Sequence, residues 1–338
     1  MRPMFDLQKK RVLEYIGKGK YRRVLLQFPE GLKPQGFKLA REIERESGAE
    51  VIVSADACYG ACDLAVEARD QLMADTLVHY GHSPMNNGDA VNILFVEARA
   101  TENIDAAVKK ALELLRDENR IGLTTVVQHV DQLEHAAGIV RDSGKEPFIG
   151  KASGHAKYPG QILGCDYSTA TSIEAHVDSY IFIGGGNFHA IGIELATGKR
   201  TIVADPYLNQ ARDMTETTKL LLRKRWATIT KFQDSKKVGI VIGLKMGQKN
   251  IESAETVKSL LEMMGKECVL LSAIECTPEN LESFVDINAF VTTACPRLAI
   301  DDQERFTRPI LNTEEVLIAV GKKRWEDYGR YVSEQKTA

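Results

Sequence analysis

A cysteine that follows a buried strand and precedes a helix constrains this chain more than any other feature. Residues 51–53 (Val-Ile-Val) form an apolar run that predicts a strand, and residues 64–68 predict a helix. Between them lies the sequence Asp-Ala-Cys-Tyr-Gly-Ala-Cys-Asp, residues 56–63. Open α/β sheets bind their ligands at the carboxyl ends of strands. There the free backbone N–H groups and the helix dipole favour a thiolate, the form of cysteine that binds metal.

Two further cysteines lie in similar surroundings, and the pattern of strands and helices recurs around each of them. Cys165 follows a predicted strand at 147–152, and Cys295 follows the apolar run 289–292 and precedes Pro296. The other predicted strands are 23–28, 50–54, 75–80, 91–96, 121–128, 177–183, 200–204, 237–243, 267–272 and 309–312. We therefore predict an α/β fold of three consecutive pseudo-repeated domains with parallel sheets around a central cluster site.

The spacing of the cysteines suggests the limits of these domains. Residues 1–105 contain Cys62, residues 106–209 contain Cys165, and residues 210–338 contain Cys295. The third domain is expected to begin with a long linking helix over 210–230 and to end with a helix over 314–331 that packs its aromatic side chains onto the domain. The basic run 223–225 in the linking helix is expected to be a solvated face, as such runs usually are.

Composition narrows the class of protein. The chain has 338 residues, a formal net charge of -3 and no apolar run near the ~20 residues that a membrane helix needs. Its start lacks the apolar stretch of a signal peptide. We expect a cytoplasmic protein that does not bind nucleic acid directly or associate with a membrane. Six cysteines without a secretory signal argue against disulfides and for thiols that serve metal binding or catalysis.

The functional interpretation of the three strand-end cysteines is a shared thiolate site. Cys62, Cys165 and Cys295 would hold a [4Fe–4S] cluster with one iron open for a substrate, because soft thiolate ligands select iron–sulfur chemistry. The alternative is three small buried hydrophobic residues, which is how free cysteines commonly behave. Cys268 is expected in the core and Cys276 is expected to be structural. Cys58 is either a thiol behind the ligands or a loop residue without a role.

Other candidates come from strand ends and are each weighed against a structural role. The run Gly184-Gly185-Gly186-Asn187 could cradle a carboxylate or phosphate, although it lacks the spacing of a nucleotide fingerprint. His82 and His189 follow third strands and could face one central cavity, or each could be a hydrogen-bonded structural histidine. Arg297 with residues 301–302 could hold a charged amino-acid group, or the two aspartates could start a helix.

With these residues assembled, the chain resembles the diphthamide-synthesis family of 2-(3-amino-3-carboxypropyl)histidine synthases. The resemblance rests on residues 59–63 (Tyr-Gly-Ala-Cys-Asp), 160–166 (Gly-Gln-Ile-Leu-Gly-Cys-Asp) and 293–302, which starts Thr-Ala-Cys-Pro-Arg. It also includes residues 27–32 and the Gly-His-Ser loop at 81–83, and it covers nearly the whole chain. The archaeal form is the closer match, because one chain carries all three cysteines.

The resemblance implies a homodimer with a [4Fe–4S] cluster on Cys62, Cys165 and Cys295, and S-adenosylmethionine as the substrate near the open iron. It implies reductive cleavage of the bond from sulfur to the γ-carbon, which yields methylthioadenosine and a 3-amino-3-carboxypropyl radical. That radical would add to C2 of a histidine imidazole in translation elongation factor 2, with electrons from a donor that the sequence does not identify. The residues expected around S-adenosylmethionine are Gln27, Glu30, Gly31, His82, Gly185, Asn187, His189 and Arg297.

Two other functions remain open at this point. The first is a three-domain [4Fe–4S] dehydratase or condensing enzyme resembling quinolinate synthase, in which the open iron acts as a Lewis acid on a small diacid. The second is a non-catalytic iron–sulfur subunit that passes electrons. Electron carriers commonly have four protein ligands, which argues against the second function. Formation of methylthioadenosine would separate the transferase from both.

Overall fold

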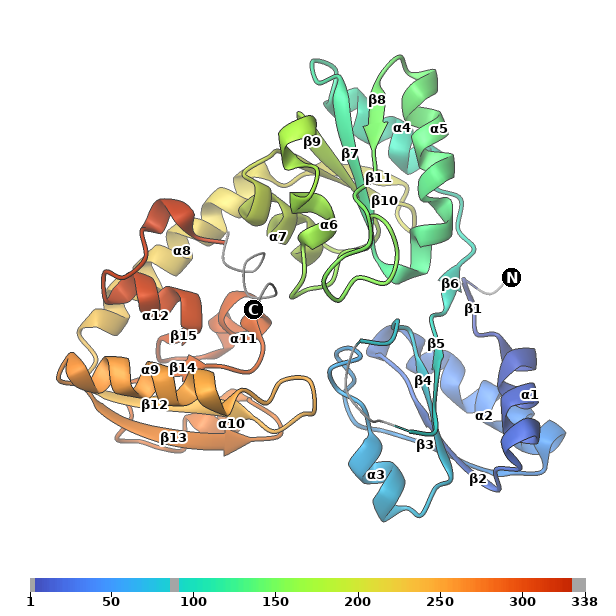
Figure 1. Cartoon of the computed structure of the whole chain (residues 1–338), viewed down its shortest axis with the longest axis horizontal. Coiled ribbons are helices and arrows are strands. Elements are labelled where there is room, and N and C mark those ends of the chain that lie inside the picture. Colours follow the sequence, from blue (N-terminus) through green and yellow to red (C-terminus); the bar gives the residue numbers. More distant parts are fainter. Residues whose placement is uncertain (1–3, 86–90, 330–338) are drawn as a thin grey trace.

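A computed structural model describes residues 4–85 and 91–329, which form three lobes around a common centre (Figure 1). The first sheet contains β2 (Arg23–Gln27), β3 (Glu50–Val53), β4 (Thr76–Tyr80) and β5 (Ile93–Val96). The second contains β7 (Arg120–Thr125), β8 (Glu146–Phe148), β9 (Ser179–Ile183), β10 (Thr201–Asp205) and β11 (Gln210–Asp213). The third contains β12 (Lys237–Gly243), β13 (Glu267–Ala273), β14 (Ala289–Thr292) and β15 (Ile310–Asn312). A short ribbon of β1 (Phe5–Asp6) and β6 (Arg99–Ala100) lies between the first two lobes.

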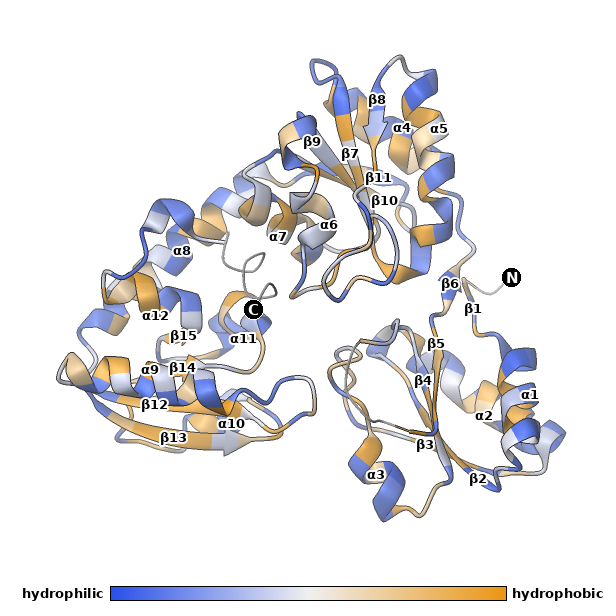
Figure 2. Cartoon of the chain, viewed as in Figure 1, coloured by the Kyte–Doolittle hydropathy of each residue, from blue (hydrophilic) through white to orange (hydrophobic). Residues whose placement is uncertain are grey.

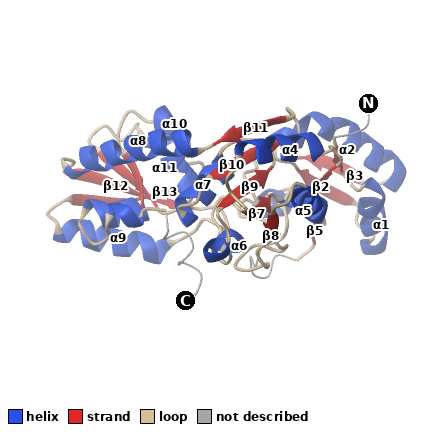
Figure 3. Ribbon diagram, turned by 90° about the horizontal axis from the view of Figure 1, so that it is seen from above, coloured by secondary structure: helices blue, strands red, loops and turns tan. Residues whose placement is uncertain are grey.

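The helices cover both faces of these sheets, as the view from above also shows (Figure 3). The first lobe has α1 (Lys9–Gly19), α2 (Lys33–Ser47) and α3 (Val66–Gln71). The second has α4 (Asp105–Leu114), α5 (Leu133–Asp142), α6 (Ser168–Thr171) and α7 (Phe188–Thr197). The third has α9 (Ile251–Met263), α10 (Pro278–Leu281), α11 (Pro296–Ile300) and α12 (Thr313–Ala319). The long helix α8 (Thr215–Gln233) connects the second lobe to the third (Figure 1).

The three sheets share one strand order. When strands are counted in chain order within each sheet, the spatial order is 2-1-3-4 in all three, and the second sheet adds a fifth strand at its edge. The pairs are parallel, apart from the one that β11 makes with β10. In such a sheet the chain reverses its winding between the first and third strands, and ligands bind at the carboxyl ends near that point. The predicted α/β fold with parallel sheets is confirmed.

Burial on both faces explains why the central strands are apolar throughout. In β2, Val24 and Leu26 belong to a core with α1 and α2, while Leu25 belongs to a core with the start of α3. Neighbouring residues on a strand point to opposite faces, so a parallel strand with helices on both sides needs an unbroken apolar run. Figure 2 shows the same feature in the third lobe, where β12 and the inner side of α9 are hydrophobic. These runs are the signal from which the strands were predicted.

The predicted linking helix is wrong at its start. Residues 210–213 form β11, which pairs antiparallel with β10, so not every strand in the sheets is parallel. The side chain of Asp205 accepts hydrogen bonds from the backbone N–H groups of Tyr207 and Leu208, at 3.0 and 3.1 Å, and Asn209 has a positive φ of 49°. This turn reverses the chain into a hairpin. The predicted boundary between 209 and 210 therefore separates two strands that pair with each other.

Several other predicted elements are shorter in the structure. The strand predicted over 121–128 ends at Thr125 and is followed by a 3₁₀ helix over Val127–Gln132. The strand predicted over 147–152 is limited to Glu146–Phe148. The last predicted helix is divided into α12 and a 3₁₀ turn at Trp325–Asp327, and its predicted end at residue 331 lies outside the described residues. Its aromatic packing is confirmed: Tyr328 is buried in the core of the third lobe and stacks on Trp325.

The sequence pattern predicts that the basic run on α8 is a solvated face, but one of its three side chains is buried. Arg225 is fully buried and forms a two-pronged ion pair with the equally buried Glu315, at 2.6 and 2.5 Å. Its guanidinium also donates to the carbonyl of Ile310, and Tyr328 donates to Glu315 at 2.9 Å. The pair joins α8 to α12 and β15. Glu315 is 90 residues from Arg225 in the sequence, so the charge pattern around Arg225 does not reveal this partner.

Replacement of Arg225 with methionine is expected to destabilise the protein strongly. The substitution leaves the Glu315 carboxylate buried without its cation, which costs about 3–5 kcal/mol in comparable cases. Urea unfolding followed by circular dichroism measures the loss. The matched control is Arg223→Met on the exposed side of α8, which should change the free energy of unfolding by less than about 0.5 kcal/mol. Equal stabilities for the two variants would contradict the role given to the buried pair.

Candidate metal centre

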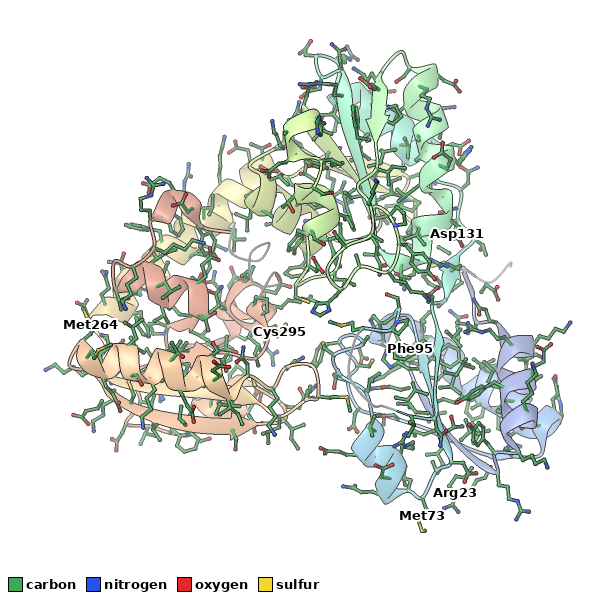
Figure 4. The ribbon with its side chains drawn as sticks, viewed as in Figure 1. Arg23, Met73, Phe95, Asp131, Met264 and Cys295 are labelled. Carbon is green, nitrogen blue, oxygen red and sulfur yellow. The ribbon has the colours of Figure 1, made fainter. Side chains whose placement is uncertain are left out.

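The three strand-end cysteines line one cavity of about 320 Å³, which we call the three-cysteine cavity. Cys62 lies in the loop between β3 and α3, and Cys165 lies in the loop between β8 and α6. Cys295 follows β14 and is the N-cap residue of α11. In Figure 4, Cys295 lies on the third lobe where that lobe faces the other two. The shared strand order thus places the three thiols at the carboxyl edges of three different sheets.

Burial controls the chemistry of these thiols. It raises the pKa of Cys62, and together with the neighbouring Cys62 and Cys165 it raises the pKa of Cys295 to about 12. The expectation that a helix N-terminus would favour free thiolates is therefore wrong: α11 has five residues, and α3 begins four residues after Cys62. Desolvation outweighs so short a dipole. Metal binding would release the thiol protons.

The donor set of the cavity fits an iron–sulfur cluster with an open position. Among the residues that the structure describes, the cysteines on its walls are Cys62, Cys165 and Cys295, and none of them forms a disulfide there. Three soft sulfur ligands suit iron–sulfur chemistry and leave one metal site for another ligand. The cavity also has the size of a small-molecule site. The residues present therefore fit a [4Fe–4S] cluster that is bound beside a substrate.

A loop of the third lobe holds Cys62 in place. Gly247 donates its N–H to the carbonyl oxygen of Cys62 at 3.0 Å, and the Gln248 amide donates to the Cys62 sulfur at 3.6 Å. Nearby, Lys245 forms ion pairs with Asp63 at 2.8 Å and Glu275 at 2.6 Å. This cysteine therefore belongs to the first lobe by sequence and is positioned by the third.

Lys245 also lies over an aromatic ring of the cysteine loop. Its ammonium is 4.4 Å from the centre of the Tyr59 ring, a distance at which a cation and an aromatic face attract each other. The Lys245 side chain is largely buried, so its attraction to Asp63 and Glu275 is screened less than that of a surface pair. The two carboxylates raise the pKa of this lysine although burial opposes them. The contact joins two lobes at the edge of the cavity.

Behind the cavity, Gln27, His79 and His82 form a chain of hydrogen bonds. The Gln27 amide donates to the carbonyl of Asp63 at 2.7 Å and accepts from the N–H of Ala65 at 3.1 Å. Its oxygen also lies 2.8 Å from Nδ1 of His79, whose Nε2 lies 2.9 Å from Nδ1 of His82. His82 lines the cavity, whereas Gln27 supports it from outside.

The remaining predicted site residues lie in different places. His189 and Arg297 line the three-cysteine cavity together with His82, so the two histidines do face one cavity. Arg297 pairs with Asp301 at 2.9 Å and lies 4.4 Å above the Phe188 ring. The next residue, Asp302, lies 3.6 Å from the guanidinium of Arg305.

Besides Gln27, four predicted residues are absent from the described walls of this cavity. The Glu30 side chain is mostly exposed and pairs with Lys33, and Gly31 is in the adjoining 3₁₀ turn. Gly185 packs near the ring of Tyr207. Asn187 lines a neighbouring cavity of about 550 Å³ between the second and third lobes. Their assignment to the S-adenosylmethionine pocket remains a prediction.

The other cysteines are distributed much as their contexts suggest. Cys276 belongs to a core cluster of the third lobe, and Cys268 packs against another. Cys58 is buried beside His79 and His82, where desolvation raises the pKa of its thiol to about 12. Cys58 is not on the described walls of the three-cysteine cavity, whereas Cys62 is.

Three contributors were missed in the sequence. Lys245, Gly247 and Gln248 lie in the loop after β12, the first strand of the third sheet. The corresponding loop of the first lobe, residues 27–32, supplies predicted site residues because it lies at a strand end and belongs to the resemblance. The shared position of the two loops is the signal that could have identified the third-lobe residues.

Three thiols that line one cavity at the carboxyl edges of three α/β sheets are typical of proteins that bind a metal through cysteine. Comparison with known proteins then identifies the family. The model of the diphthamide synthesis protein family matches residues 28–331, so the chain belongs to that family. The resemblance stated from the sequence is confirmed.

The relatives agree in sequence and in fold. The chain is 34% identical over 326 residues to the 2-(3-amino-3-carboxypropyl)histidine synthase of Pyrococcus horikoshii, covering 96% of this chain and 93% of that protein. It is 31% identical to subunit 1 of the Schizosaccharomyces pombe synthase, covering 96% and 75%. A crystal structure of Dph2 from Pyrococcus horikoshii with a 4Fe-4S cluster superimposes with a TM-score of 0.88, at 33% identity and 96% and 94% coverage.

Two further findings bear on the class of protein. The relatives' names describe a synthase that is a transferase, so the predicted enzyme class is confirmed. Among the helices of residues 4–85 and 91–329, none is long and apolar enough to cross a membrane.

Substitution of Gly247 with alanine is expected to impair metal binding. A Cβ atom at this position would lie 2.6 Å from both Cα and Cβ of Cys62, a distance that requires one backbone to move. Anaerobic reconstitution followed by iron and sulfide analysis should show at least a twofold loss of cluster. In the control Gly138→Ala on α5, the new Cβ has no heavy atom within 4 Å, and iron content should not change. Full loading of the Gly247 variant would contradict this role.

Proposed function

We propose that the chain is a 2-(3-amino-3-carboxypropyl)histidine synthase that catalyses the first step of diphthamide formation. The observation that carries the proposal is the convergence of Cys62, Cys165 and Cys295 on one cavity. The relatives' names and the 4Fe-4S cluster of the Pyrococcus horikoshii structure support it. The substrate is S-adenosylmethionine, and the acceptor is a histidine of translation elongation factor 2.

In the proposed reaction, the bond from the sulfonium sulfur to the γ-carbon breaks, and a bond from that carbon to C2 of the imidazole forms. The cluster supplies one electron for the cleavage and needs an external donor to be reduced first. The products are methylthioadenosine, the modified histidine and one proton. No net oxidant is consumed, because the electron is recovered when the imidazole ring regains its aromaticity.

The residues of the cavity would orient the reactants for this transfer. The Arg297 guanidinium is a donor suited to the carboxylate of the amino-acid group, and the side chain of His82 lies on the same cavity. Residues of all three lobes line the cavity, which would limit access of water to a reactive radical. We further propose that the enzyme works as a homodimer, with an electron donor that is still to be identified.

The proposal predicts methylthioadenosine as the nucleoside product. The protein is reconstituted anaerobically with iron and sulfide, reduced with dithionite and mixed with S-adenosylmethionine and elongation factor 2. Chromatography should detect methylthioadenosine, and mass spectrometry should show an aminocarboxypropyl group on the factor. A different nucleoside, 5′-deoxyadenosine, would mean that another bond is cleaved. No cleavage by an intact, reduced cluster would instead favour a dehydratase or an electron-transfer subunit.

The ligand assignment predicts a loss of cluster in each of three single variants. Cys62→Ala, Cys165→Ala and Cys295→Ala each remove one of three sulfur ligands, so iron content and visible absorbance after reconstitution should fall at least severalfold. The control is Cys268→Ala, which alters a partly buried thiol that packs against the core of the third lobe and should retain the cluster. A full iron complement in all three variants would contradict the assignment.

A further inference from the structure

The ring of His82 can be assigned one tautomer from its surroundings. The nitrogen of the Gln27 side chain donates to the carbonyl of Asp63, so the amide oxygen must face Ala65 and His79. An oxygen only accepts hydrogen bonds, so Nδ1 of His79 carries the proton. In neutral His79, Nε2 is then an acceptor, and the proton between the two rings belongs to Nδ1 of His82.

This leaves Nε2 of neutral His82 without a proton. Gln27 and His79 are buried at 3% and 0% exposure, so water does not compete for their hydrogen bonds. His82 itself is partly exposed and lines the three-cysteine cavity with Cys62, Cys165 and Cys295. Burial lowers the pKa of His82 to about 4 although a hydrogen bond with the Tyr80 backbone opposes this shift, and the result agrees with a neutral ring.

The transfer chemistry needs a group of this kind. When the aminocarboxypropyl carbon bonds to C2 of the acceptor imidazole, that carbon still carries its hydrogen. Aromaticity returns when the C2–H bond breaks, which releases one proton and one electron. The electron is the one used for the cleavage and returns to the cluster, so only the proton needs an acceptor from the protein. We propose that Nε2 of His82 takes this proton, and that Gln27 and His79 are positioning residues that keep Nε2 free to do so.

The other histidine of the cavity is less suited to this task. His189 lines the same cavity, but its ring stacks on Phe182, with centroids 5.5 Å apart. No hydrogen bond to either of its ring nitrogens is found within residues 4–85 and 91–329, so nothing described fixes its tautomer. A proton acceptor works best when its lone pair is held in place before the reaction. The chain from Gln27 supplies that restraint to His82.

The same amide connects the proton acceptor to the cysteine loop. Gln27 bonds to the carbonyl of Asp63 and to the N–H of Ala65, which follow Cys62 by one and three residues. A single side chain therefore fixes both the loop of one proposed cluster ligand and the tautomer of His82. This inference rests on the proposed transferase function, which supplies the C2 proton.

The first test reads the tautomer without any turnover. The full chain is labelled with ¹⁵N-histidine and studied before cluster reconstitution, and the His82 signals are identified by their loss in His82→Gln. We expect a neutral ring with a protonated Nδ1 and an unprotonated Nε2. Gln27→Met, which removes the anchoring amide, should give a mixture of tautomers. A proton on Nε2 of His82 in the wild-type chain would overturn the proposal.

The second test separates cleavage from transfer in the reconstituted holoenzyme. In His82→Gln, transfer to elongation factor 2 should fall about 10²–10⁴-fold relative to the methylthioadenosine formed in the same reaction, as expected for a lost proton acceptor. Added imidazole should restore part of the transfer to the smaller variant His82→Ala. The control is His135→Gln, an exposed histidine that pairs with Asp105 and is not on the described walls of the cavity, and this variant should transfer normally.

The outcomes distinguish this inference from the function on which it rests. Transfer at the wild-type rate in His82→Gln, or an equal loss of cleavage and transfer, would overturn the role of His82 alone. An intact, reduced wild-type enzyme that makes no methylthioadenosine would overturn the transferase function and this step with it. Cleavage without transfer in His82→Gln, together with rescue by imidazole, would support both.

Discussion

The structure depends on the meeting of three sheets at their carboxyl edges. No single segment of this chain holds enough sulfur ligands for a cluster, because the three strand-end cysteines are more than 100 residues apart. Each sheet has the strand order 2-1-3-4, and each therefore directs its loops to the same kind of edge. When the three edges face one another, the loops become the walls of one cavity. The site is thus a property of the arrangement of the lobes.

Such a site requires contacts that hold the lobes in register. The loop after β12 supplies one, because it binds the carbonyl and the sulfur of Cys62 and pairs Lys245 with Asp63. The amide of Gln161 supplies another, because it donates to the hydroxyl of Ser83 at 2.8 Å and joins the second lobe to the first. Both contacts lie beside the three-cysteine cavity, so the residues that fix the lobes also shape the site.

The sequence was most informative where the signal is local. Apolar strands followed by loops that contain cysteine predicted the α/β fold and the three thiols of the cavity, because a buried parallel strand requires an unbroken apolar run. The side chain of Arg225 was misjudged, since its charge is satisfied by Glu315, 90 residues away. Gln248 was missed for the same reason, because its partner Cys62 is 186 residues away and belongs to another lobe.

Local patterns also gave a wrong secondary structure where a turn reverses the chain. Residues 210–213 look like the start of a helix, yet the Asp205 side chain and the positive φ of Asn209 turn them back along β10. For Gln27 the sequence predicted a place near the site but not the contacts that the side chain makes there. It was placed in the site from its strand-end position, but its contacts with Asp63, Ala65 and His79 come from three segments that only the fold brings together.

The energetics of the thiols connect assembly to function. Burial raises the pKa of Cys62 and Cys295, so the metal-free cavity contains protonated, weakly ligating sulfur. A bound metal replaces those protons and gains three ligands from three lobes at once, so part of its binding free energy would stabilise the arrangement of the lobes. The same desolvation keeps His82 neutral at the cavity wall. One physical condition, the burial of the side chains on the cavity wall, therefore keeps the thiols protonated until a metal binds and keeps the His82 ring neutral.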